Sequence, residues 1–106
     1  MNIAETPQPP YYAVIFTSIK SDNTKGYDAM SDKMIELVTQ QKGFLGFESA
    51  FNEIGITVSY WTDEAAILAW KTNVAHQAAQ HKGIQQWYDS YAIRVCKVER
   101  AYSFGM

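Results

Sequence analysis

The chain has 106 residues, with nine lysines and arginines, eleven aspartates and glutamates, and a formal net charge of −2. This length suits one domain, and the interspersed charges form no basic stripe, which argues against nucleic acid as a partner. Cys96 is the only cysteine and no apolar run of about 18 residues occurs, so no internal disulfide and no membrane span are expected, and a cytoplasmic location is favoured.

Residues 1–10 form a polar, proline-rich lead-in that is expected to be a flexible segment and not a signal peptide. Residues 11–106 are expected to form a single domain. The run 11–19 is β-branched and aromatic, which predicts a strand with apolar side chains on both faces. A strand of that kind needs cover on both sides.

Apolar residues at steps of three and four predict a helix over about 25–42, with Gly43 as its C-terminal stop. Strands are expected at 44–51 and 56–61, joined by a tight hairpin at 52–55. Thr62-Asp63-Glu64 combines a capping residue with acidic groups that suit a helix N-terminus, which predicts a helix up to Trp70.

The segment 73–82 is also predicted to be helical, after a break or bend near Thr72–Asn73, and Gly83 is expected to interrupt it. A turn-rich or helical piece at 84–89 and a long final strand at 91–104 follow. The order β-α-β-β-α-β predicts an α+β fold of the ferredoxin-like, split-βαβ type. Its four-stranded antiparallel sheet would carry two helices on one face.

In such a fold the helices cover only one face of the sheet. Seven apolar strand residues are too many for that face alone: Tyr12, Val14, Phe16, Phe47, Phe51, Tyr60 and Val98. An exposed apolar patch usually marks an interface, so we infer a two-fold homodimer with the sheets packed face to face. The alternative is that loops or the N-terminal segment cover the second face.

Candidate functional residues gather between Ser59 and His76, where indole, phenol, amide and imidazole side chains are concentrated. Large flat rings beside one proton acceptor suit an aromatic or tetrapyrrole ligand. On a continuous helix Trp70 and His76 would point to opposite faces, at about 100° per residue. A shared pocket therefore requires the bend predicted near Asn73.

Each candidate has a functional and a structural interpretation. His76 is a candidate base that takes a phenol proton and returns it, or else a surface or capping histidine. Asn73 is a candidate donor to a substrate carbonyl or oxyanion, or else the cap of the next helix. Trp70 is a candidate floor of the pocket, or else a core tryptophan on an amphipathic helix.

Tyr60 and Trp61 are candidate substrate-binding residues. They point to opposite faces of their strand, so at most one of them lines a given cavity. Arg94 is a candidate partner for a phenolate, or else for a neighbouring acid. Two histidines five residues apart without an adjacent acid make no metal ligand set, and no glycine-rich phosphate loop is present.

Several of these residues resemble the antibiotic biosynthesis monooxygenase family over roughly residues 11–104. The matching positions are Ser59-Tyr60-Trp61, Glu64-Ala65, Trp70-Lys71, Asn73, His76, Ala79, Gly83, Trp87-Tyr88 and the ending Val95 to Phe104. The resemblance implies a dimeric α+β barrel with a ligand pocket in each subunit between the sheet and the helices.

The resemblance implies two activities: cofactor-independent oxygenation of aromatic, quinone-forming molecules, and haem binding with oxidative haem degradation. The haem-degrading branch has a first-strand asparagine and a helical tryptophan followed ten residues later by a histidine. Here only Trp70 matches, because residue 80 is Gln80, His81 lies one place further, and the first strand carries Phe16-Thr17-Ser18.

The leading expectation is therefore a cofactor-independent, metal-free monooxygenase acting on a small aromatic or quinol-type molecule. His76 would be the base, Asn73 or Arg94 would stabilise the anion, and Trp61 and Trp70 would enclose it. A haem-binding or haem-degrading enzyme, with His76 or His81 on the iron, is one alternative. A non-catalytic dimer that binds a small molecule is the other.

Overall fold

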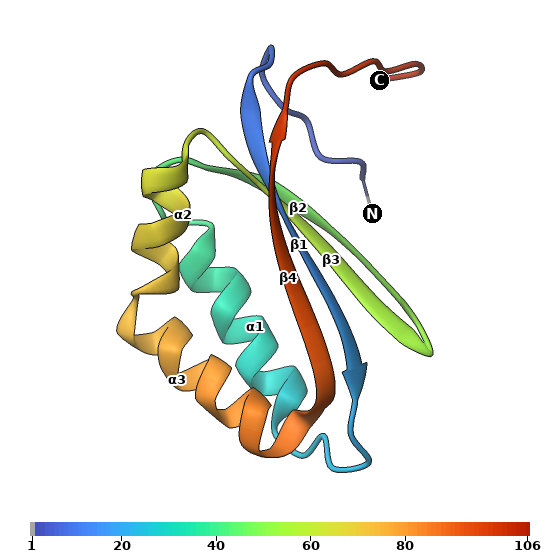
Figure 1. Cartoon of the computed structure of the whole chain (residues 1–106), viewed down its shortest axis with the longest axis vertical. Coiled ribbons are helices and arrows are strands. Elements are labelled where there is room, and N and C mark those ends of the chain that lie inside the picture. Colours follow the sequence, from blue (N-terminus) through green and yellow to red (C-terminus); the bar gives the residue numbers. More distant parts are fainter. Residues whose placement is uncertain (1) are drawn as a thin grey trace.

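The computed structural model describes residues 2–106, in which one four-stranded antiparallel sheet carries its helices on a single face (Figure 1). The strands are β1 (Tyr11–Lys20), β2 (Phe44–Asn52), β3 (Ile54–Trp61) and β4 (Tyr88–Val98), in the order β2-β3-β1-β4. The helices are α1 (Tyr27–Val38), α2 (Glu64–Lys71), α3 (Val74–Lys82) and a π-helical turn, η1 (Gly83–Trp87). The predicted ferredoxin-like α+β fold is confirmed, with its second crossover divided into separate helices.

The register of the sheet decides which side chains face the helices. Val14 on β1 lies opposite Ser59 on β3 and Val95 on β4. Directly opposed residues in antiparallel strands share a face, and successive residues alternate between faces. These side chains line the space beneath the helices, so even-numbered residues of β1 and odd-numbered residues of β3 and of β4 from Tyr91 onward point to that side. Tyr88 lies beyond a register shift at Ile19/Lys20 and lines the same space.

The apolar strand residues are distributed differently from the sequence-based expectation. Five of the seven lie on the helix side of the sheet: Tyr12, Val14, Phe16, Phe47 and Phe51. Tyr60 and Val98 lie on the open side. The exposed apolar groups of that side are mainly isoleucines, with Ile19, Ile54 and Ile56 at 45%, 46% and 45% exposure. The alternation of each strand, and not the number of apolar residues, settles which face a residue occupies.

Segments from both chain ends cover part of the open side (Figure 1). The Ala4 N–H donates to Glu48 Oε2 at 3.0 Å, and a Cβ at Gly46 would lie 3.3 Å from that of Ala4. Tyr11 and Ala13 beneath them are only 5% and 6% exposed. The N-terminal segment thus covers one end of this face and leaves the exposed isoleucines uncovered.

The final strand begins and ends earlier than the predicted 91–104. Gly83 keeps helical angles (φ −59°, ψ −47°), so the chain continues through η1 and does not break there. Tyr88 then opens β4. The strand ends at Val98 because its partner Tyr11 is the first residue of β1. Prolines precede Tyr11, and a proline has no N–H with which to extend the ladder.

The first helix is also shorter than predicted, ending at Val38, and a turn leads to Gly43 at φ +86°. A Cβ on Gly43 would lie 2.6 Å from the Ala66 Cβ and 2.7 Å from the Thr62 Oγ1. The position therefore requires glycine for two reasons, its backbone conformation and the close approach of α2. No helix within residues 2–106 has the length and apolarity needed to cross a membrane.

We expect Gly43→Ala to lower the free energy of unfolding by about 2 kcal/mol, from left-handed strain plus overpacking against α2. Urea denaturation of the variant and the wild-type protein measures this change in the free energy of unfolding. Gly26→Ala is the matched control, because Gly26 has a similar φ of +83° but its Cβ would meet nothing closer than 4.0 Å. If both variants lost the same free energy of unfolding, the close approach of α2 to Gly43 would contribute nothing to the cost of the substitution.

Candidate functional site

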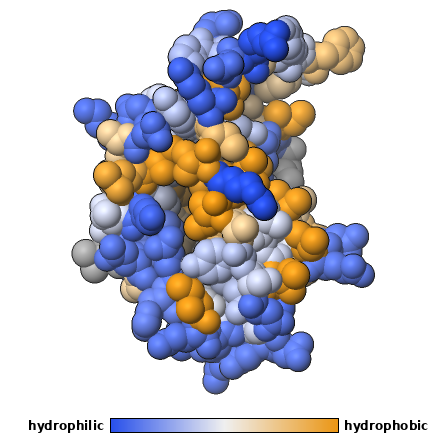
Figure 2. Space-filling model, in the orientation of Figure 1, coloured by the Kyte–Doolittle hydropathy of each residue, from blue (hydrophilic) through white to orange (hydrophobic). Residues whose placement is uncertain are grey.

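A cavity of about 630 Å³ lies between the helices and the covered face of the sheet. This volume is within the range of small-molecule sites, and the lining is mostly apolar and aromatic. On β4 the lining residues Tyr91, Ile93 and Val95 are 39%, 44% and 49% exposed, so the cavity opens along this edge strand. Figure 2 shows hydrophobic atoms gathered over α2 and across the neighbouring end of the sheet.

Trp70 and His76 both line this cavity, and their rings stack at 4.4 Å between centroids with 15° between planes. They meet because the helix breaks between them: Thr72 ends α2 and Asn73 begins α3. The bend predicted near these two residues is confirmed. On a continuous helix the two side chains would point about 120° apart around the helix axis and would not stack.

The imidazole of His76 has a defined proton arrangement. Its Nδ1 lies 3.1 Å from the backbone oxygen of Trp70. A carbonyl oxygen only accepts, so Nδ1–H is the donor and the lone pair of the neutral ring is on Nε2. None of the hydrogen bonds found among residues 2–106 involves Nε2.

Burial lowers the pKa of His76 below its ordinary value of 6.5, and the hydrogen bond to the Trp70 carbonyl opposes this only in part. The ring is therefore neutral at pH 7. A neutral imidazole with a free Nε2 on an apolar cavity is equipped to accept a proton from a bound molecule.

Asn73 caps the N-terminus of α3. Its Oδ1 accepts hydrogen bonds from the backbone N–H groups of Ala75 (3.0 Å) and His76 (3.2 Å), the pattern of a helix N-cap. Asn73 is also not among the residues that line the cavity. The structure thus gives it the capping geometry, which positions His76 at the start of α3.

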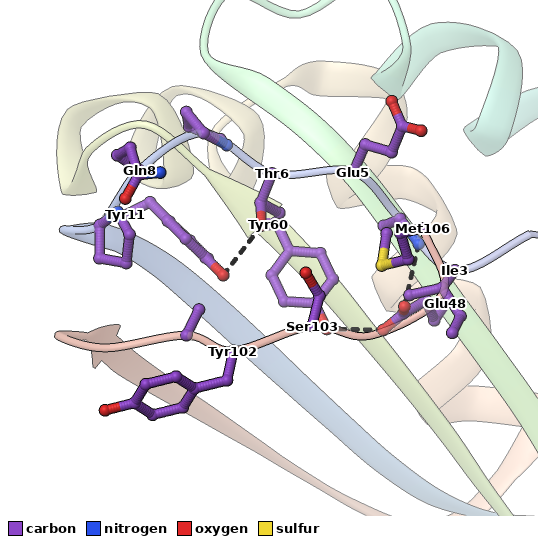
Figure 3. Close-up of a pocket in the computed structure, with 14 residues that line it drawn as sticks. Ile3, Glu5, Thr6, Gln8, Tyr11, Glu48, Tyr60, Tyr102, Ser103 and Met106 are labelled. Carbon is purple, nitrogen blue, oxygen red and sulfur yellow. Dashed lines mark hydrogen bonds between the residues drawn. The ribbon is translucent and has the colours of Figure 1, made fainter.

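Trp61 and Tyr60 occupy opposite faces of β3, as expected. Trp61 lines the cavity, is 1% exposed, and donates from Nε1 to Ser59 Oγ at 2.9 Å. Tyr60 lies on the open side, in a hollow of about 530 Å³ between the two terminal segments (Figure 3). It donates to Glu48 Oε1 at 2.6 Å, and burial followed by this hydrogen bond raises the pKa of Tyr60 to about 12.

Arg94 is likewise separated from His76. It pairs with Ile15 on the open side of the sheet, is exposed, and does not line the cavity. The predicted grouping of Tyr60 and Arg94 with His76 and Trp70 is therefore not found, because strand alternation puts the sheet between them.

His81 is exposed on α3, whereas Gln80 lines the cavity.

A tyrosine pair that sequence reasoning missed lines the cavity near the start of α1. Tyr88 donates its hydroxyl proton to the Tyr27 oxygen at 3.3 Å. The Lys20 ammonium lies 4.1 Å from the centroid of the Tyr27 ring. Burial, then the hydrogen bond to Tyr27, raises the pKa of Tyr88. No local pattern signals the pair, since its members come from distant segments.

The sequence matches known proteins over most of its length. A family model described as antibiotic biosynthesis monooxygenase matches residues 10–82. YqjZ of Bacillus subtilis strain 168, described as uncharacterized, is 50% identical over 104 residues that cover 96% of this chain and 91% of YqjZ.

Solved structures share the fold. Rv0793 from Mycobacterium tuberculosis has a TM-score of 0.76 at 13% identity, covering 88% of this chain and 99% of its own. SnoaB, a cofactor-independent oxygenase from Streptomyces nogalater, has a TM-score of 0.74 at 7% identity, covering 88% of this chain and 97% of its own. At these identities the likeness is one of architecture alone.

Proposed function

The chain belongs to the antibiotic biosynthesis monooxygenase family, and we propose that it is a cofactor-independent monooxygenase acting on an aromatic, anthrone- or quinol-type molecule. The observation that carries the proposal is the neutral imidazole of His76, with its free Nε2, on the wall of an apolar cavity. The fold shared with a cofactor-independent oxygenase supports the same reaction class.

The reaction begins when Nε2 of His76 accepts the hydroxyl proton of the substrate in its phenol or enol form. The resulting anion is electron-rich and delocalised onto a ring carbon, from which it reduces dioxygen. Formation of a carbon–oxygen bond gives a peroxide anion, which takes the proton back from the imidazolium. Elimination of water then leaves a ketone, so one oxygen atom enters the product and the other leaves as water.

Trp70 and Trp61 have the geometry to hold a flat substrate during these steps. Trp70 is half-buried and presents its ring beside His76, while Trp61 is buried deeper in the same cavity. An apolar enclosure strengthens the interaction between the substrate anion and the imidazolium, because the local dielectric is low. In this mechanism Asn73 acts by capping α3, and Arg94 has no part.

Oxygen uptake with 1,8-dihydroxyanthrone and with simple quinols tests the proposal directly. Uptake that depends on the protein, with one water and one ketone formed per dioxygen, supports it. Tight binding of these compounds without turnover would instead favour a binding module. A Soret shift on haemin addition that is lost in His76→Ala would favour the haem alternative.

The pH dependence provides a second test. Only neutral His76 accepts a proton, and its pKa in the folded protein is below 6.5. We therefore expect kcat/KM to decline on the acid side with a midpoint below pH 6.5, because the pKa of His76 is lowered, and to approach a tenfold loss per pH unit below that midpoint. A decline centred above pH 6.5 would contradict a buried imidazole base.

We also propose that the protein is a homodimer joined through the open side of its sheet. The exposed Ile19, Ile54 and Ile56 support this, because an antiparallel sheet face left in water is normally polar. Sedimentation at micromolar concentration tests the assembly. Ile56→Lys is expected to give monomers, and a wild-type monomer would contradict the proposal.

A further inference from the structure

The cavity has a second polar end, remote from His76. Tyr27 at the start of α1 and His76 at the start of α3 both line it. The Tyr27 ring packs edge-on against Trp87, at 5.5 Å between centroids. Within α3 alone, residue 82 lies about 9 Å along the helix axis from residue 76 at 1.5 Å per residue, and η1 then carries the chain on to Trp87. The end of α1 that lies beside η1 is remote from the α2–α3 junction (Figure 1), so Tyr27 and His76 line different parts of the same cavity.

The hydroxyl of Tyr27 is arranged to donate. Among residues 2–106 its only hydrogen bond is the one it accepts from the Tyr88 hydroxyl. A phenol that already accepts still has its own proton to give, and none of the described residues takes it. The bond from Tyr88 also restricts the rotation of this proton.

Neighbouring groups reinforce the donor character of the pair. The Lys20 ammonium over the Tyr27 ring withdraws electron density from the phenol, which strengthens its O–H as a donor. The raised pKa of Tyr88 keeps that hydroxyl protonated. The Tyr88 ring is itself held in place against Gly83, where a Cβ would come within 2.8 Å of it.

We propose that Tyr27, positioned by Tyr88, binds a carbonyl-type oxygen on the end of the substrate remote from the proton that His76 removes. This inference rests on the proposed function for the orientation of the substrate. Tyr27 is then a specificity-determining residue. It selects flat molecules that carry a hydroxyl at one end and a hydrogen-bond acceptor at the other.

The test compares two planar probes, 6-acetyl-2-naphthol and 6-isopropenyl-2-naphthol, which differ only in a carbonyl oxygen replaced by a methylene. Binding is measured by quenching of tryptophan fluorescence. We expect the wild-type protein to bind the acetyl compound about fivefold more tightly, as one net hydrogen bond provides. Tyr27→Phe keeps the ring packing and is expected to abolish this preference.

Two further variants make the test specific. Tyr91→Phe removes another hydroxyl from the same cavity and is expected to keep the fivefold preference. Tyr88→Phe frees the Tyr27 hydroxyl to rotate and is expected to reduce the preference to about twofold. An unchanged preference in Tyr27→Phe would overturn the inference, as would a wild-type protein that binds the two probes equally or binds neither.

Oxygen uptake by the same variants separates this inference from the proposed function. Discrimination that depends on Tyr27, in a protein that consumes no oxygen, would uphold the inference and contradict the monooxygenase. Oxygen consumption by the wild-type protein, together with an unchanged probe preference in Tyr27→Phe, would support the monooxygenase and contradict this inference.

Discussion

Replacing His76 with alanine is expected to lower the rate of oxygen consumption by about 10²- to 10⁴-fold, the usual contribution of a positioned general base. The variant loses Nε2 on the cavity wall and also the Nδ1–H bond to the Trp70 carbonyl. Single-turnover measurements at saturating dioxygen report the chemical step directly. Substrate affinity is expected to change far less than the rate.

Two controls separate chemistry from structure in this experiment. His76→Phe keeps an aromatic ring against Trp70 but has no nitrogen, so its loss of rate should match that of the alanine variant. His81→Ala removes an exposed histidine from the same helix and should leave the rate unchanged. A full rate in His76→Ala would refute the assignment of the base.

The largest expected effect on stability is that of Trp61→Ala, about 3–5 kcal/mol in the free energy of unfolding. Trp61 is 1% exposed, packs edge-on against Phe44 at 5.2 Å, and hydrogen-bonds Ser59 through its indole nitrogen. Removing it leaves a void next to the cavity and an unpaired hydroxyl. Since small domains are stable by only about 5–15 kcal/mol, the variant approaches the limit of folding.

Trp70→Ala is the matched comparison, because Trp70 lines the same cavity but is only half-buried. We expect it to cost clearly less stability than Trp61→Ala while weakening the binding of flat ligands more. Urea denaturation and ligand titration of both variants measure the contrast. Equal stability losses would show that Trp61 contributes no more than Trp70 to the folded core.

Much of the fold is visible in the sequence because its signals are local. The capping residues Asp63 and Asn73 mark helix starts, and the structure shows both side chains accepting backbone N–H bonds. Alternation along β3 correctly separates Tyr60 from Trp61. The stacking of His76 on Trp70 follows from the break between α2 and α3, which Asn73 signals in the sequence.

Other features depend on long-range pairing. Assigning Arg94 to a face requires the register of β4 against β1, which no local pattern contains. The Tyr27–Tyr88 hydrogen bond joins residues 61 positions apart. The early end of β4 at Val98 reflects where its partner strand begins, and not the β-propensity of the residues that follow.

The opening of the cavity along β4 has a consequence for how such proteins diversify. Ile93 and Val95 border the opening on an edge strand, so new side chains there alter the outline of the entrance without disturbing the two interior strands. The proposed base, His76, and the tryptophan stacked on it belong to the α2–α3 junction instead. Selection can therefore change which molecules enter while the stacked His76–Trp70 pair is inherited intact, which makes this architecture readily evolvable.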